Sequence, residues 1–425
     1  MTSRGSALAV GAAVSWPRSE RLLPRERRGN EAVAGVLVFS AICFNAVLCL
    51  VNTQLFAVSQ ICVIVSEIMI VAASFIYSIV YWNPAMIPMT ILLLFSAILW
   101  LAESLVNQAV NPLIAGDMVI PPIFMMLGIA TASNRLPKFV VYLLGLVFAI
   151  AAFEAVAPIK FTRLLNIENF YIGTRHFTGA DFYNEESDLF ASATRPDERY
   201  LLPFLDVHRL SSVFLEPVSL GNYVIIMLIV LLAYRQVVGP GLFWGLLALD
   251  GLLLIGSDGR LALGLCAVLV VAAPVIPKLP RWGSLLVLPA TIAVVLAIVT
   301  ALGSTPNLDT FAGRTAKTVA VLFSLDAGNW LGLTSPATLD KLVDSGLAYF
   351  IASQSPLGLL ILWLVAFGTA PGSRRGLLMH YGAAIYLAGT MAVSYSSFSI
   401  KTAALLWYML GHPRRRDDER GPAWV

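Results

Sequence analysis

The stretch VAGVLVFSAICFNAVLCLV, residues 33–51, decides the class of the fold. It carries no charged side chain, and a helix of roughly 20 apolar residues is long enough to cross a bilayer. Further apolar stretches of this kind follow at residues 57–80, 85–106, 112–132, 139–158, 218–234, 241–256, 261–275, 282–302, 347–367, 377–394 and 400–410. The sequence therefore predicts an all-α polytopic membrane protein with about 12 transmembrane helices.

The composition agrees with lipid as the main solvent of the chain. Of 425 residues, 58% are hydrophobic and only 12% are charged, and the mean hydropathy is +0.80. Soluble domains carry about twice that charged fraction. All four cysteines lie inside apolar stretches, so neither a disulfide framework nor a cysteine metal site is expected. The N-terminus does not match a cleavable signal, because its apolar stretch is short and arginine-rich sequence follows.

Basic residues on the connections predict the orientation. They occupy the termini and alternate connections, as Arg21, Arg25, Arg27, Arg28, Arg135, Lys138, Arg235, Lys278, Arg281, Arg374, Arg375, Arg414, Arg415 and Arg416. With twelve spans all of them fall on one side, and an excess of Lys and Arg marks the cytoplasmic side. Both termini are therefore expected in the cytoplasm.

The same reasoning divides the chain into seven parts. They are a cytoplasmic N-terminal arm (1–32), a first set of five helices (33–158), a first large outer loop (159–217), a second set of four helices (218–302), a second large outer loop (303–346), a last set of three helices (347–411) and a basic cytoplasmic tail (412–425). The first outer loop is rich in charge and aromatic residues, which favours a folded cap. Two large loops on one face indicate that the protein works at the outer surface.

Three arginines are expected on that outer side. Arg209 lies in HRLSSVFLEP (208–217), Arg260 in SDGRLA (257–262) and Arg314 in FAGRT (311–315). Arginine stays charged in almost any environment and holds phosphate through a planar fork of donors, so the three side chains suit a lipid pyrophosphate. The alternative is that each pairs with a phospholipid or with a nearby acid, namely Asp206, Asp258 or Asp309.

These motifs resemble those of the O-antigen ligase and Wzy-type polysaccharide polymerase superfamily. The run 209–221 resembles its outer-loop arginine motif, and 257–262 resembles its Ser-Arg-x-Ala turn with two residues inserted. Gly313 and Arg314 match its second-loop arginine, and 344–349 with 355–358 match the end of that loop and the next helix. The forms at 214–217 and 344–346 are more similar to exopolysaccharide polymerases of the xanthan type. The ligases carry a histidine near the end of the second loop, and this chain has none there.

The resemblance implies a GT-C-type membrane glycosyltransferase of the bacterial inner membrane that needs no metal and no cofactor. Its substrates would be an undecaprenyl-pyrophosphate-linked oligosaccharide and the growing polysaccharide chain, at the periplasmic face. Arg209, Arg260 and Arg314 would neutralise the leaving pyrophosphate. Membrane lipids, a chain-length regulator and an export complex are the other expected partners, and no nucleic acid is expected.

A general base is needed to deprotonate the attacking hydroxyl. Glu216 and Asp344 are the first candidates, because they flank a motif arginine or end a loop, and His208 is the third. Glu216 could instead be a carboxylate at a helix N-terminus, with Pro217 in the first turn. His208 could equally make ordinary hydrogen bonds in the loop.

Two other functions stay open on the sequence. One is a ligase that transfers a lipid-linked glycan to an acceptor, and the other is a transporter or flippase that binds the same lipid without reacting. Four acids lie within or near predicted spans, namely Glu67, Glu103, Glu154 and Asp250, and could couple transport to protons or bond helices together. The sequence shows no convincing internal repeat of the kind common in transporters, which favours the enzyme.

Overall fold

A computed structural model describes residues 29–133, 135–175, 189, 193, 208–302, 311–342, 344–368 and 370–413. Within these ranges the chain is helical and contains no strand. The α-helices are α1 (Glu31–Gln54), α2 (Gln60–Val80), α3 (Ile87–Asn107), α4 (Pro112–Ala130), α5 (Lys138–Val156), α6 (Pro158–Leu164), α7 (Ile167–Arg175), α8 (Pro217–Tyr234), α9 (Pro240–Ser257), α10 (Arg260–Ala272), α11 (Val287–Leu302), α12 (Phe311–Ser324), α13 (Ala327–Trp330), α14 (Pro336–Leu339), α15 (Gly346–Phe367), α16 (Arg374–Met391) and α17 (Ile400–Gly411).

Eight helical segments in the described part of the chain are long and apolar enough to cross a membrane. They are Glu31–Gln54, Gln60–Val80, Pro84–Asn107, Lys138–Val156, Pro217–Tyr234, Pro240–Ser257, Arg281–Ala301 and Gly346–Phe367. Several of them expose large apolar side chains, such as Ile61 on α2 and Ile98 on α3, which are 71% and 69% exposed. Such surfaces need lipid as their solvent, so the chain is a helical membrane protein.

Each of the twelve predicted stretches overlaps a helix, but four of these helices do not meet the criterion of length and apolar character. Two of the four, α4 and α10, contain shorter apolar stretches at Ile114–Ala130 and Arg260–Ala272. The other two are α16 and α17, and the count of twelve spans stays a prediction.

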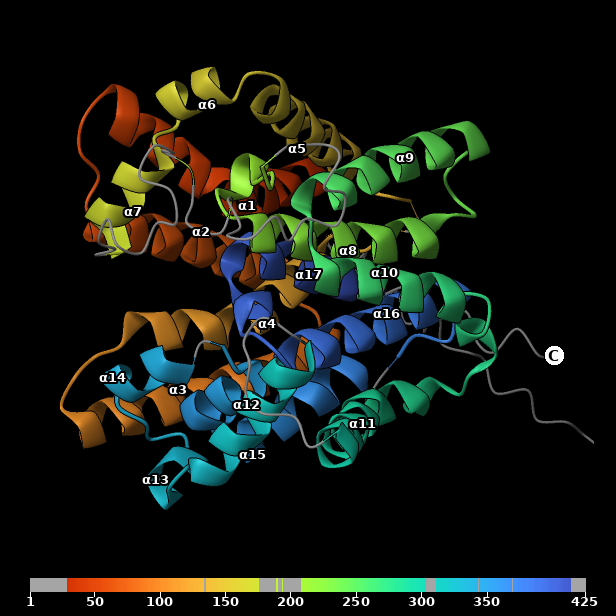
Figure 1. Cartoon of the computed structure of the whole chain (residues 1–425). Coiled ribbons are helices and arrows are strands. Elements are labelled where there is room, and N and C mark those ends of the chain that lie inside the picture. Colours follow the sequence, from red (N-terminus) through yellow and green to blue (C-terminus); the bar gives the residue numbers. More distant parts are fainter. Residues whose placement is uncertain are drawn as a thin grey trace, which may run out of the picture.

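The helices form one bundle whose two ends differ (Figure 1). We call the end where α8 and α15 begin the loop end, because the two long predicted loops precede these helices. It lies on the left in Figure 1, with α7, α13 and α14. At the opposite end the Tyr234 hydroxyl lies 2.8 Å from His412 Nδ1, and the Tyr381 hydroxyl donates to Pro280 O over 2.7 Å.

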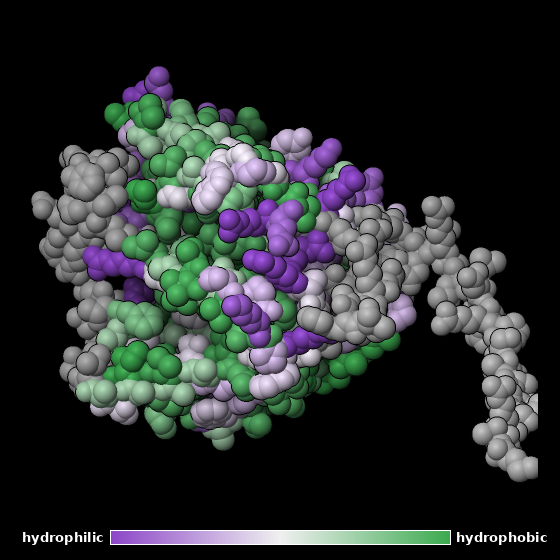
Figure 2. Space-filling model, turned by 90° about the vertical axis from the view of Figure 1, so that its right-hand side faces the viewer, coloured by the Kyte–Doolittle hydropathy of each residue, from purple (hydrophilic) through white to green (hydrophobic). Residues whose placement is uncertain are grey.

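The basic connections lie at this opposite end. Arg375 stacks over the ring of Tyr234, at 5.2 Å, and Arg235 over the ring of Phe243, at 5.5 Å. Seen from this side, the surface gathers hydrophilic residues in its centre (Figure 2). The arginines of the N-terminal arm and of the tail lie outside the described residues. Arg235 and Arg375, from two of the basic connections, thus lie at the same end, whereas the orientation in a membrane stays a prediction.

The short helix α17 is the centre of the bundle. All of its residues are buried, and it packs most closely on α4, where Gly128 and Gly411 let the two backbones meet. A Cβ atom at Gly128 would overlap Tyr408 O, and one at Gly411 would overlap Met125 O. Its 12 residues span about 18 Å, less than the ~30 Å of a bilayer core. The connection 392–399 between α16 and α17 therefore enters the bundle.

One helix break falls inside a sequence motif. Ser355 in α15 has φ 62° and ψ 162°, and Pro356 follows it without an N–H to donate. The Ser355 hydroxyl accepts from Gly358 N over 3.2 Å, so it caps the second half of the helix. The Ser-Pro-Leu-Gly motif at 355–358 therefore marks a break in the helix.

Candidate functional site

Glu216 is the centre of a buried ionic cluster at the loop end. It is the N-cap residue of α8, as one sequence interpretation had it, but its carboxylate makes no capping hydrogen bond. Instead Oε1 lies 3.0 Å from an Arg175 guanidinium nitrogen and 3.1 Å from Lys401 Nζ. The same oxygen accepts from the Tyr171 hydroxyl over 2.8 Å, and Oε2 accepts from the Ser219 hydroxyl over 3.0 Å. The cluster ties α7, α8 and α17 together.

The charges in this cluster hold Glu216 ionised. Burial raises the pKa of its carboxyl, but Lys401 and Arg175 outweigh burial and lower the pKa to about 2. A carboxylate with so low a pKa is a weak proton acceptor. Glu216 is therefore better suited to holding cations in place than to acting as a base.

Lys401 is the residue of this cluster that the sequence reasoning missed. It is 1% exposed at the start of α17, and its ammonium also donates to Phe214 O over 3.2 Å. Arg175, too, was not singled out, and Tyr171 was considered only as one of the aromatic residues of the first loop. A lone lysine inside a short apolar stretch is costly in lipid, and that cost was the available signal.

A second set of polar side chains lies close to this cluster. The Tyr349 hydroxyl donates to Asp117 Oδ2 over 2.9 Å, and the ring of Tyr349 packs on that of Tyr395 with centroids 4.6 Å apart. Glu67 interacts electrostatically with Lys401 and Arg175, and also with Asp117. Asp117 was overlooked in the sequence although it lies in a predicted span. Glu67 of α2 thus links the cations of the Glu216 cluster to the Asp117–Tyr349 pair of α4 and α15.

Arg209 lies in a segment organised by Glu154. The Glu154 carboxylate is fully buried and accepts from Ser211 N and Ser212 N, the latter over 2.7 Å, and from the Ser211 hydroxyl over 3.0 Å. His208 Nε2 lies 3.3 Å from Glu154 Oε1. Glu154, one of the four acids noted in the sequence, therefore holds the 208–212 segment in place through hydrogen bonds, and His208 is one of its contacts.

The Arg209 side chain is itself buried and turns toward the α9–α10 connection. Its Nε donates to Ser257 O over 3.2 Å and lies 4.0 Å from Asp258 Oδ2. Asp258 adopts a left-handed backbone, with φ 46°, at the tight turn before Arg260. Two of the sequence motifs are therefore in direct contact. Asp258, which the sequence offered as the neighbouring acid of Arg260, lies near Arg209, while Asp206 and Asp309 lie outside the described residues.

Arg260 and Arg314 are both exposed, at the starts of α10 and α12. Leu261, which follows Arg260, and Val319, five residues after Arg314, pack against one small cluster formed by Val295, Ala392 and Val393. The structure therefore brings the two motif helices onto the start of the α16–α17 connection.

That connection, residues 392–399, contacts α8, the start of α15, and the side chains Leu261 and Val319 of the two motif helices. Ser394 O meets the backbone of Gly346 at the start of α15, and Tyr395 packs on Tyr349. The Ser396 hydroxyl accepts from Asn222 Nδ2 of α8 over 2.9 Å. Lys401 follows two residues after the connection ends. Sequence reasoning did not identify this segment as part of the site.

Asp344 has a cation of its own. Its Oδ2 lies 3.0 Å from Lys317 Nζ, one turn along α12 from Arg314, and 46% of its side chain is exposed. It is therefore accessible, unlike Glu216. Within the described ranges no group of three or more His, Cys, Asp or Glu side chains is placed to hold a metal ion.

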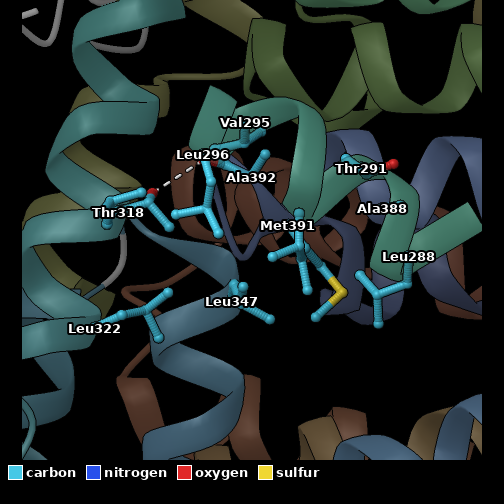
Figure 3. Close-up of a pocket in the computed structure, with 12 residues that line it drawn as sticks. Leu288, Thr291, Val295, Leu296, Thr318, Leu322, Leu347, Ala388, Met391 and Ala392 are labelled. Carbon is cyan, nitrogen blue, oxygen red and sulfur yellow. Dashed lines mark hydrogen bonds between the residues drawn. The ribbon is translucent and has the colours of Figure 1, made fainter. Parts of the chain in front are cut away.

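A narrow apolar pocket of about 40 Å³ lies between α11, α12, α15 and α16 (Figure 3). Leu288, Val295, Leu322 and Met391 point into it. The Thr318 hydroxyl donates a hydrogen bond to Ala392 O over 2.9 Å. The lining offers hydrocarbon contacts only. It borders the cluster on which the Arg260 and Arg314 helices pack.

Fold and site together define a helical membrane protein with a buried ionic cluster and several arginines at one end of its bundle. Comparisons with family models, with curated proteins and with solved structures find no match for this chain. The resemblance to the polymerase superfamily therefore rests on the motif residues, and the activity is a proposal.

Proposed function

We propose that the chain is a membrane glycosyltransferase that polymerises undecaprenyl-pyrophosphate-linked oligosaccharide repeat units at the periplasmic face of the bacterial inner membrane. The hydroxyl oxygen of one repeat unit attacks the anomeric carbon of another. The bond from that carbon to the pyrophosphate oxygen breaks, undecaprenyl pyrophosphate leaves with the electron pair, and a base takes the hydroxyl proton. In this proposal the chain crosses the membrane twelve times, with both termini in the cytoplasm.

One observation carries the proposal. The helices that bear Arg260 and Arg314 pack on one end of the 392–399 connection, and the Glu216 cluster lies at its other end. Arg209 lies beside the Arg260 turn. Fixed cations next to a reacting centre stabilise a leaving pyrophosphate, because they are already oriented when its charge develops.

The roles of the carboxylates follow from their surroundings. The low pKa of Glu216 makes it a poor base. Its role in this proposal is to hold Arg175 and Lys401 in place through the two ion pairs. Asp344 fits the base better, because nearly half of its side chain is exposed and Lys317 orients one of its oxygens. His208 contacts the buried Glu154 and so suits a structural role.

The proposal is tested by incubating the purified protein with a synthetic undecaprenyl-pyrophosphate-linked repeat unit and separating the products by size. We expect a ladder of products with the wild-type protein and its loss in Arg314→Ala. This variant is preferred to Arg209→Ala because Arg314 is exposed and Arg209 is buried. Arg235→Ala, at the opposite end of the bundle, is the matched control and should retain the ladder.

The same experiment separates the alternatives. A single transfer to an added acceptor glycan, without a ladder, would support the ligase. Intact donor despite demonstrated donor binding, together with its movement across vesicle membranes, would support the transporter. A full ladder in Arg314→Ala would contradict the role given to that arginine.

A further inference from the structure

The second predicted outer loop contains an apolar surface that its position in a loop does not explain. Three large apolar side chains are exposed within nine residues: Phe323 at the end of α12 (84% exposed), Trp330 in α13 (41%) and Leu331 just after it (61%). α12 is amphipathic, and Gly313, Thr315, Ala316 and Thr318 form its buried face. An exposed apolar group of this kind on a loop in water would be costly.

The contact between this segment and α15 shows how far along that helix the segment lies. A Cβ atom at Gly332 would lie 2.8 Å from Ser355 N, so the turn after α13 touches the break in α15. Ser355 lies nine residues after Gly346, the first residue of that helix, which places it about 14 Å along the helix axis. Since α15 is one of the eight helices able to cross the membrane, α13 lies beside its outer half rather than above it.

The surroundings of the segment point the same way. In Figure 1, α12 and α13 lie on the flank of the bundle next to α15, which both contact. Asn107, at the loop end of α3, donates to Thr334 O over 3.3 Å. Next along α3 comes an apolar face toward lipid, with Leu105 70% exposed and Ile98 69% exposed. The exposed side chains of the segment therefore continue a lipid-facing surface.

The backbone N–H groups of the turn after α13 are hydrogen-bonded within the segment, as a position next to lipid requires. Polar backbone groups in lipid must be satisfied within the protein. Trp330 N, Leu331 N and Gly332 N donate to Asp326 O, Ala327 O and Asn329 O, each within 3.1 Å. Asn329 N donates to Asp326 Oδ1, and the Thr334 hydroxyl donates to Asn329 Oδ1, both over 2.8 Å. The exposed Asp326 needs polar surroundings, so the segment fits the boundary between headgroups and acyl chains.

We infer that the α12–α13 segment is a re-entrant interfacial element, and that Phe323, Trp330 and Leu331 contact the acyl chains of the same membrane. The occupant of this surface is phospholipid. The inference needs only the membrane embedding and does not depend on the transferase activity. It also places Arg314, on the same helix, near the headgroup layer.

A labelling experiment on the full chain tests this. Cys62, the exposed cysteine, is replaced by serine, and single cysteines are introduced as Leu331→Cys, Ile98→Cys and Lys341→Cys. Ile98 on α3 is the reference for lipid contact, and the exposed Lys341 is the reference for water. Each variant carries a bimane label and is reconstituted into phosphatidylcholine vesicles. Quenching by a phospholipid with a doxyl group on its acyl chain is compared with quenching by iodide.

We expect the label at 331 to behave like that at 98, with blue-shifted emission, strong quenching by the doxyl lipid and weak quenching by iodide. A pattern like that at 341 would mean that the segment lies in water and would overturn the inference. Weak quenching by both agents would also overturn it, because the surface would then be covered by protein, such as a second copy of the chain.

Discussion

The ionic cluster around Glu216 leads to a double-mutant prediction. Glu216→Gln removes the negative charge shared by Lys401 and Arg175, and Lys401→Met removes one of the cations. Both side chains are largely buried, at 16% and 2% exposure. Removing one partner of a buried ion pair leaves the other charge without compensation, which is why such changes destabilise strongly.

The structure gives the size of the effect. The carboxyl pKa falls from 4.5 to about 2, and at about 1.4 kcal/mol per unit the ionised state is stabilised by roughly 3 kcal/mol in the folded protein. Glu216→Gln should therefore lower the free energy of unfolding by about 3 kcal/mol. Lys401→Met should cost somewhat less, about 2 kcal/mol, because Arg175 still pairs with the carboxylate. Arg175 replaces only part of the interaction that Glu216 loses with Lys401, because its side chain is 42% exposed and water and salt weaken its attraction to the carboxylate.

The assay is reversible unfolding in detergent micelles, followed by helical circular dichroism, for the two single variants and the double variant. If the two residues act as a pair, the double variant loses about 2 kcal/mol less than the sum of the single losses. Additive losses would show that Lys401 and Glu216 are energetically independent and would refute the reasoning. So would single variants that unfold like the wild-type protein.

Two more predictions follow from the same contacts. Because the pKa of Glu216 is lower in the folded protein than in the unfolded chain, its contribution to stability is present above pH 4.5 and is lost as the pH falls toward about 2. The melting temperature of the wild-type protein should therefore fall over this pH window, and that of Glu216→Gln should fall less. Equal slopes in the two proteins would contradict this assignment. Glu154→Gln should lower the free energy of unfolding by about 2–3 kcal/mol, because the backbone N–H groups of Ser211 and Ser212 lose a charged acceptor. Glu103→Gln is its control, since Glu103 accepts a hydrogen bond from the side chain of Asn107 and not from backbone N–H groups, and an equal loss in both variants would argue against a special role for Glu154.

Parts of the candidate site could be read from the sequence because charge in an apolar chain is conspicuous. Arg209, Arg260 and Arg314 were found in this way, and the structure brings the first two into adjoining turns. The partners of Glu216 could not be found, because Arg175 and Lys401 are 226 residues apart in the chain. No local pattern links residues so distant, and only the packing of α17 in the centre of the bundle joins them.

The role of the carboxylates also depended on the fold. From the sequence, Glu216 and Asp344 were equal candidates for a base. Their surroundings differ: two cations and burial hold Glu216 ionised, whereas Asp344 has a single lysine and an accessible side chain. A proton affinity depends on nearby charge and solvent, and neither can be read from residue type.

The sequence by itself determined that this chain is a helical membrane protein with its basic connections at one end, because the length and apolar character of each segment are local properties that lipid selects. Tertiary structure decided the rest. It drew the 392–399 connection into the bundle, buried Lys401 against Glu216, and laid α13 along the flank of α15. These outcomes depend on close packing between distant segments, as at Gly128 and Gly411, where the backbones of α4 and α17 touch.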